Sequence, residues 1–217
     1  MAVTIDDARK LVADAALWPR VRETLRDFAP QVHASWLEGL AGGPTGALDL
    51  ASPRVKAYVL EQLGVEPHLH LFPKDDWSRL VLLPGATLLA LCEWLGVLAY
   101  ADTLRQVTNG ATVRALKAAL PGVYPEAFGY CAYFGRLKSA KVPLPEGETP
   151  ADDVLAAGYR MLLKVLAKLD GQLVTRFRLK LPKALSGLKP LDIDPKDVNL
   201  ALLMKLKFPE AYDLCCS

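Results

Sequence analysis

Residues 80–101 read LVLLPGATLLALCEWLGVLAYA and form the most apolar segment of the 217-residue chain. Glu93 is the only charged residue in this segment. A helix of this length could span a bilayer. However, Pro84 and Gly85 shorten the usable helix to about 16 residues, and Glu93 would place a charge in the middle of the membrane, where it is costly. We therefore expect a buried helix and no insertion into the membrane.

The composition of the whole chain agrees with a large apolar core. Hydrophobic residues make up 52% of the chain, charged residues 23%, and the formal net charge is +2. These values exclude a disordered chain, which needs low hydrophobicity and high net charge. The N-terminus does not read as a secretory signal, and the four cysteines lack zinc or redox spacing. We therefore expect a cytoplasmic protein.

Helical periodicity runs through nearly the whole sequence. Three helix starts combine a capping residue with proline at the first helical position, namely Ser52-Pro53, Thr149-Pro150 and Asp194-Pro195. Apolar residues follow each start at a spacing of three or four, and Gly64 ends the first helix. The sequence predicts an all-α fold, a compact globular domain of about eight to ten helices.

Two longer helices and one linker complete this prediction. We expect helices over residues 31–40 and 85–108. The polar, proline-rich segment 142–148 reads as a linker. It would join an N-terminal helical lobe, residues 1–141, to a C-terminal lobe, residues 149–217, packed on the first.

Residues 174–181 fit two kinds of secondary structure. Strict alternation from Thr175 to Leu181 fits a strand with a cationic face. The spacing of Leu169, Leu173 and Phe177 by four fits a continuation of the preceding helix. We favour the helix, because a lone strand has no partner in an all-α protein.

Signatures of catalysis are absent from the sequence, which contains no phosphate-binding glycine loop, nucleophile elbow or His-Glu-x-x-His. His68 and His70 could supply two metal ligands, but a stable site needs three or four. The adjacent Cys215 and Cys216 could bridge only with strain. We expect no catalytic residue, metal or cofactor.

Charge is unevenly distributed. Between residues 160 and 190 the chain has one acid, Asp170, and eight basic residues: Arg160, Lys164, Lys168, Arg176, Arg178, Lys180, Lys183 and Lys189. This segment carries +7, so the remainder carries −5. A solvated helix face would explain the cluster, and so would a surface that docks on an acidic protein. Nucleic-acid binding fits less well, because only Phe177 lies among the cations. We expect Arg176, Arg178, Lys180 and Lys183 to bind a partner.

Four stretches together resemble a known family: residues 88–105, 113–120, 177–182 and 205–212. They contain LLALCEWLGVLAY, VRALKAAL, FRLKLP and KLKFPEAY respectively. This pattern is similar to that of the SctK (YscK-like) family, the cytoplasmic sorting-platform accessory protein of bacterial type III secretion systems. The resemblance covers roughly residues 80–215.

The resemblance implies a mostly helical adaptor without enzymatic activity or a small-molecule substrate. Such proteins connect the cytoplasmic domain of the inner-membrane ring protein to the C-ring-like pod protein. They are cytoplasmic and peripheral to the inner membrane. The family has no catalytic residues to transfer to this chain.

The alternative is a small helical ligand-binding or enzymatic domain. Its pocket would be lined by Trp77, Glu93, Trp94 and Tyr100. A buried Glu93 would have a raised pKa and could act as an acid or base.

Overall fold

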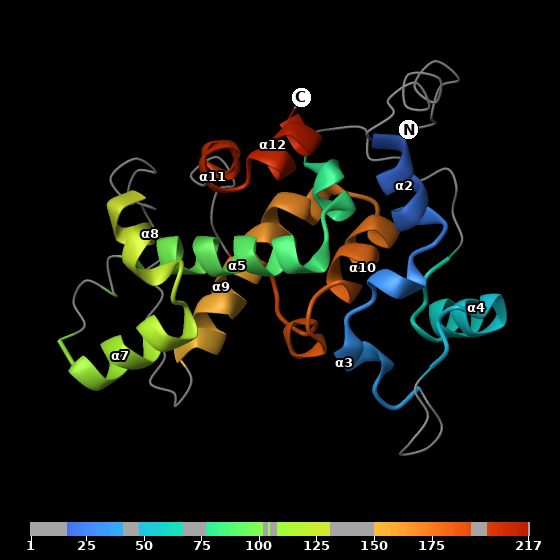
Figure 1. Cartoon of the computed structure of the whole chain (residues 1–217), viewed down its shortest axis with the longest axis horizontal. Coiled ribbons are helices and arrows are strands. Elements are labelled where there is room, and N and C mark those ends of the chain that lie inside the picture. The colour runs from blue at the N-terminus through green and yellow to red at the C-terminus, as the bar shows by residue number, and fades with distance from the viewer. Residues whose placement is uncertain are drawn as a thin grey trace. The chain divides into compact units, whose positions relative to one another are not determined.

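The computed structural model of the protein describes most of the chain, namely residues 17–40, 48–66, 77–101, 104, 108–130, 150–191 and 199–216. Every regular element in these ranges is an α-helix or a short 3-10 helix (Figure 1). The all-α prediction is confirmed.

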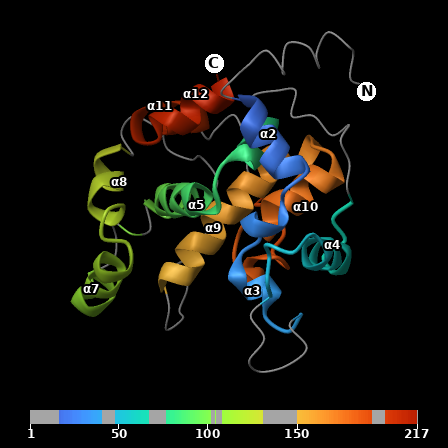
Figure 2. The same ribbon diagram turned by 45° about the vertical axis from the view of Figure 1, so that its right-hand side comes forward.

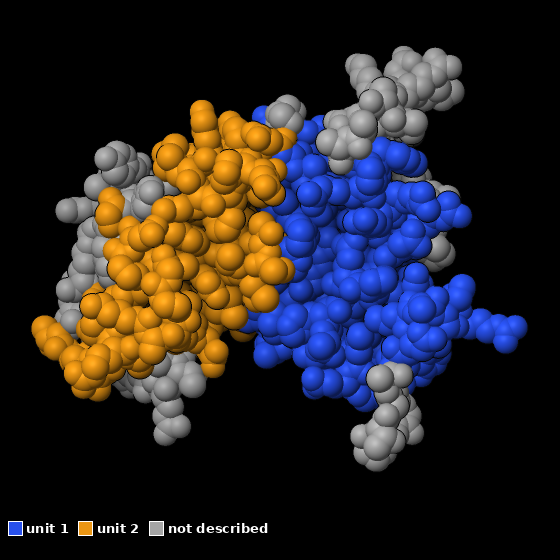
Figure 3. All heavy atoms as spheres, viewed as in Figure 1, with its two compact units in different colours: residues 1–85, 168–186, 214–217 blue, residues 86–167, 187–213 orange. Residues whose placement is uncertain are grey.

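The chain forms two compact units, coloured separately in Figure 3. Unit 1 comprises residues 1–85, 168–186 and 214–217, and unit 2 comprises residues 86–167 and 187–213. Each unit therefore draws on segments that are far apart in the sequence. The predicted linker, residues 142–148, lies outside the described residues, and the division into lobes at 1–141 and 149–217 stays a prediction.

The regular elements of unit 1 in the described residues are short helices (Figure 2). Its elements are α2 (Leu17–Leu25), η1 (Ala29–Gln31), α3 (Ala34–Leu37), α4 (Pro53–Gln62), η2 (Ser78–Leu82), α10 (Gly171–Leu179) and η4 (Lys183–Leu185).

Two apolar clusters form the core of unit 1. The first joins Leu17, Val21 and Leu25 of α2 to Val81 and Leu82 of η2, with Leu173 of α10. The second contains Phe28, Val32, Val65 and Leu179. Because Leu173 and Leu179 both lie on α10, this one helix packs into both clusters.

Unit 2 contains longer helices. Its elements are α5 (Gly85–Ala99), which starts at the last residue of unit 1, α7 (Gly110–Ala119), α8 (Tyr124–Tyr130), α9 (Pro150–Val165), α11 (Leu200–Lys207) and most of α12 (Pro209–Cys216). The short η3 (Leu166–Lys168) follows α9.

Helices α5 and α9 touch through two glycines. A Cβ atom on Gly158 would lie 1.8 Å from the carbonyl oxygen of Cys92, and one on Gly96 would lie 1.9 Å from that of Val154. Because residue 92 faces 158 and residue 96 faces 154, the helices run in opposite directions where they cross. Each glycine lets the backbone of the partner helix approach more closely than any side chain would allow.

Local signals placed several helix starts correctly. Helix α4 begins at Pro53 after Ser52, with Gly64 at φ 65° beyond its end, and α9 begins at Pro150. The third start, Asp194-Pro195, lies outside the described residues. Helix α11 begins at Leu200, where the side chain of Asn199 accepts a hydrogen bond from Leu202 N, and the predicted start at Asp194 stays a prediction.

Two predicted helices differ from those in the structure. Helix α5 ends at Ala99, and Tyr100 interrupts the single helix predicted over 85–108, although Ala101 and Leu104 are again helical. Residues 102–103 and 105–107 of that prediction lie outside the described residues. Helix α3 covers only Ala34–Leu37 of the predicted 31–40, because His33 has extended backbone angles and caps it.

Residues 80–101 supply η2 and α5, and most of their side chains are buried. Among the described residues, no helix combines the length and apolar character needed to cross a bilayer.

Candidate partner-binding site

Of the four residues predicted to bind a partner, Arg176 and Arg178 lie on α10, Lys180 directly follows it, and Lys183 begins η4. Asp170 begins α10, since its side chain accepts a hydrogen bond of 2.8 Å from Gln172 N. The helical prediction for residues 174–181 is confirmed as far as Leu179, but α10 is a new helix and does not continue α9. Leu173 and Phe177 face the core, and this orientation decides which cations can reach solvent.

Lys180 points into unit 1, where it is only 1% exposed. Its Nζ donates hydrogen bonds to the carbonyl oxygens of Val81, at 2.6 Å, and Leu83, at 3.0 Å. Burial lowers the pKa of Lys180 to about 7, while the charge of Glu23 raises this pKa and that of Arg20 lowers it further. The amine thus ties the end of η2 to the end of α10.

Arg176 is completely buried. Its guanidinium donates to the carbonyl oxygen of Glu66 at 2.6 Å, and to the backbone oxygen and Oε1 of Gln172 at 3.3 Å each. Burial lowers the pKa of Arg176, and the carboxylates of Asp170 and Glu66 oppose this shift. Arg176 therefore fastens the turn that follows α4 to α10.

The two buried cations share one aromatic ring. The centroid of the Phe28 ring lies 5.9 Å from Arg176 Cζ and 6.0 Å from Lys180 Nζ. Both distances are within the range of a cation–π attraction. Phe28 is itself buried, so this arrangement belongs to the core of unit 1.

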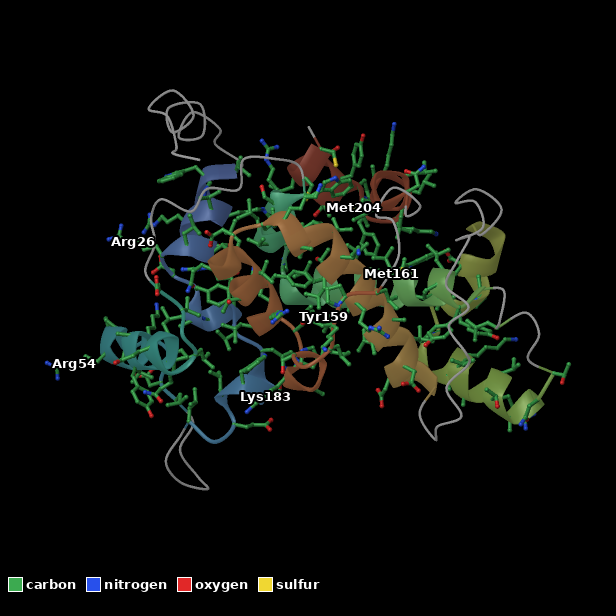
Figure 4. All side chains as sticks on the ribbon, turned by 180° about the vertical axis from the view of Figure 1, so that it is seen from behind. Arg26, Arg54, Tyr159, Met161, Lys183 and Met204 are labelled. Atoms are coloured by element: carbon green, nitrogen blue, oxygen red, sulfur yellow. The ribbon has the colours of Figure 1, made fainter. Side chains whose placement is uncertain are left out.

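The other two predicted residues reach the surface. Arg178 is half-buried and Lys183 is exposed, as the labelled side chain in Figure 4 shows. Lys183 Nζ lies 5.8 Å from the centroid of the half-buried Trp36 ring, and Trp36 Nε1 donates to Leu181 O at 2.9 Å. Lys183 N donates to Ser35 Oγ at 2.9 Å, which holds α3 against the end of α10.

The structure thus divides the predicted site. Arg176 and Lys180 cannot touch a partner while unit 1 is folded, and their role is to position α10. Arg178, Lys183 and Trp36 form the accessible part, which we call the α10 surface. Partner binding by these residues stays a prediction.

A second cationic face was missed in the sequence. Trp18, Arg22 and Arg26 are all exposed and follow one another at intervals of four residues along α2 and its last turn. The helical period that identified Val21 and Leu25 as core residues places this strip about 100° around the helix from them.

The four residues of the alternative pocket are split between the units. Trp77 belongs to unit 1, whereas Glu93, Trp94 and Tyr100 belong to unit 2, so no single unit assembles all four. Glu93 is half-buried, and burial raises its pKa. The ring of Trp94 lies 4.9 Å from Lys207 Nζ, which also pairs with Glu126.

The candidate metal ligands are only partly described. His68 and His70 lie outside the described residues, Cys215 is buried and Cys216 is half-buried. Within the part of the chain that the structure describes, no three His, Cys, Asp or Glu side chains gather as metal ligands would.

Fold and site together define, within the described ranges, a helical protein whose accessible cations and tryptophans suit contact with other proteins. Residues 26–217 match the family described as "YOP proteins translocation protein K (YscK)". The chain belongs to this family and is a type III secretion-related protein, as its resemblance predicted. No curated protein and no solved structure matches the chain.

Proposed function

We propose that this protein is a non-enzymatic cytoplasmic adaptor of a type III secretion sorting platform. It links the cytoplasmic domain of the inner-membrane ring protein to the C-ring-like pod protein. The observation that carries the proposal is the family match over residues 26–217. The two compact units support it, because separate bodies can present separate surfaces to two partners.

The α10 surface is the part of unit 1 proposed to meet an acidic partner. Arg178 and Lys183 offer positive charge, and Trp36 offers an aromatic side chain of the kind enriched at interface hot spots. Exposed charges act mainly by speeding association and fixing orientation, and their contribution weakens with salt. The buried side chains of Arg176 and Lys180 fix the position of α10, which carries Arg178.

The test is co-purification from the native bacterium with a tagged full-length chain. The ring protein and the pod protein should both be recovered. The double variant Arg178→Glu/Lys183→Glu should lose one of the two by about tenfold, whereas Lys168→Glu, an exposed cation of the same unit, should retain both.

Two results would contradict the proposal in different ways. Recovery of neither partner by the unaltered chain would reject the adaptor function. Full recovery of both partners by the double variant, with unchanged thermal unfolding, would reject the α10 surface and leave the adaptor function standing.

The alternative function rests on Glu93, because its raised pKa would suit an acid or base. A thermal-shift screen with a metabolite library tests it. A metabolite that raises the melting temperature of the unaltered chain, but not of Glu93→Gln, would favour a ligand-binding domain.

A further inference from the structure

The exposed side of α2 that carries Trp18, Arg22 and Arg26 is a surface that the proposed function does not use. The inner face of this helix, formed by Leu17, Val21 and Leu25, is fixed in the core of unit 1. The side of the helix next to this buried face carries Trp18, which is 39% exposed, together with the exposed Arg22 and Arg26.

The charges of this face are poorly compensated by the chain itself. Arg22 Nε lies 3.9 Å from Asp27 Oδ2, and the Arg22 side chain remains 60% exposed, so this pair contributes little. Glu23, the residue after Arg22, is the exposed acid next to these arginines in the sequence. Arg26 points away from the helix in Figure 4, and among the described residues it has no ion pair.

We propose that Trp18, Arg22 and Arg26 form a docking surface for an acidic α-helical segment of a partner protein. Arg22 and Arg26 are four residues apart, at the end of α2 and just after it, and each guanidinium can bind a carboxylate with two hydrogen bonds. Trp18 stands one turn further and supplies the apolar contact. Tryptophan and arginine are the residue types that most often dominate interface energies.

The surface goes beyond the adaptor function proposed above. The family match begins at residue 26, and α2 ends at Leu25. Two of the three residues of the docking surface, Trp18 and Arg22, therefore precede the matched segment.

Other anionic partners fit this face less well. A membrane-surface helix inserts a broad apolar face, but the apolar face of α2 is occupied by the core of unit 1. Single-stranded nucleic acid needs several aromatic side chains for stacking, and this face offers Trp18 alone, beside the acidic Glu23.

Photo-cross-linking in the native bacterium tests the proposal on the full-length chain. Trp18→benzoylphenylalanine should cross-link to a partner segment that carries at least two carboxylates about one helical turn apart. Tyr58→benzoylphenylalanine is the matched control, since Tyr58 is an aromatic residue of unit 1 with similar exposure. The position-18 product should be at least about tenfold more abundant than the same product from position 58.

Charge reversal then distinguishes complementarity from mere proximity. Arg22→Glu/Arg26→Glu should reduce the cross-link about tenfold or more, and replacing the partner's carboxylates with lysines should restore it. Because all three side chains are exposed, the melting temperature should stay unchanged.

Four outcomes would overturn the proposal. The first is an equal yield of cross-linked product from positions 18 and 58, and the second is a product with a partner segment that has no net negative charge. The third is a yield that Arg22→Glu/Arg26→Glu does not reduce. The fourth is a yield that stays low when lysines replace the partner's carboxylates in the presence of this double variant. Binding of the purified chain to phosphatidylglycerol vesicles or to a short DNA strand, lost in the double variant, would assign the face to lipid or nucleic acid instead. Recovery of the ring and pod proteins by this variant is scored separately, so that the adaptor function is judged on its own.

Discussion

Unit 1 and unit 2 hold their helices together by opposite chemical means. In unit 1, Arg176 and Lys180 reach inward and donate hydrogen bonds to backbone carbonyls of segments about a hundred residues away in the chain. In unit 2, Gly96 and Gly158 offer no side chain at all, and the backbones of α5 and α9 meet directly. Unit 1 uses long polar side chains to join its segments, whereas unit 2 brings two helices together where a side chain is missing.

This difference shows where composition misleads. Arginine and lysine are usually solvated, and glycine usually marks a turn. Here a cationic cluster supplies two buried residues of unit 1, Arg176 and Lys180, and two helical glycines let the backbones of α5 and α9 meet in unit 2. Substitutions at these residues should therefore destabilise each unit separately.

The largest effect is expected from Gly158→Ala. The new Cβ would lie 1.8 Å from the backbone oxygen of Cys92, which cannot move without separating α5 from α9. We expect a loss of about 3 kcal/mol or more in the free energy of unfolding. Urea denaturation followed by circular dichroism measures it.

Gly129→Ala is the control for this prediction. Gly129 lies in α8 of the same unit, and a Cβ there would meet nothing within 4 Å. Alanine favours the helix, so we expect no loss and a gain of up to about 1 kcal/mol. If both variants behaved alike, the glycine crossing would not hold unit 2 together.

A smaller effect is expected from Arg176→Ala. The variant loses the hydrogen bonds to Glu66 O and Gln172 and the contact with the Phe28 ring. We expect a loss of about 2 kcal/mol in the free energy of unfolding. Arg178→Ala removes the same side chain two residues away and should change stability by less than about 0.5 kcal/mol. If both variants lost the same free energy of unfolding, the buried contacts of Arg176 would contribute no more to stability than the side chain of Arg178.

The smallest effect is a pH dependence centred on Lys180. Its pKa is about 7 in the folded protein and about 10.4 in an unfolded chain. Between pH 7 and about 10.4, Lys180 therefore binds a proton in the unfolded state but largely not in the folded state. The free energy of unfolding rises with pH in this range. The expected slope is at most about 1.4 kcal/mol per pH unit, and Lys180→Met should abolish it.

Denaturant titrations between pH 7 and about 8.5 measure this slope. The upper limit matters, because burial also raises the pKa of the Cys92 thiol. A folded state that keeps this thiol protonated loses stability as pH rises past the unfolded thiol pKa of about 8.5. A slope unchanged in Lys180→Met would assign the pH dependence to other groups.

Local signals explain what could be predicted from the sequence. The starts at Pro53 and Pro150 and the turn at Gly64 depend on residues within a few positions, so they were correctly identified. The helix over residues 174–179 was also predicted, although its separate start at Gly171 was not. Asp170 supplied that signal, because it caps α10 locally.

Long-range contacts explain what could not be predicted. The burial of Lys180 depends on carbonyl groups of residues 81 and 83, and that of Arg176 on Glu66 and Phe28. No periodicity within residues 160–190 carries this information. The interruption after Ala99 was also missed, since an apolar run alone does not specify where a helix is broken.

The burial of Lys180 also has a practical chemical consequence. Lysine-acylating reagents need access to the amine, and Lys180 is buried, with its Nζ beside the carbonyl oxygens of Val81 and Leu83 and the Phe28 ring. By contrast, Lys168, Lys183 and Lys189 are exposed. Acylation of Lys180 therefore requires unit 1 to open, while the exposed lysines react at once. The ratio of the two labelling rates, read by mass spectrometry, reports the fraction of time that unit 1 spends open.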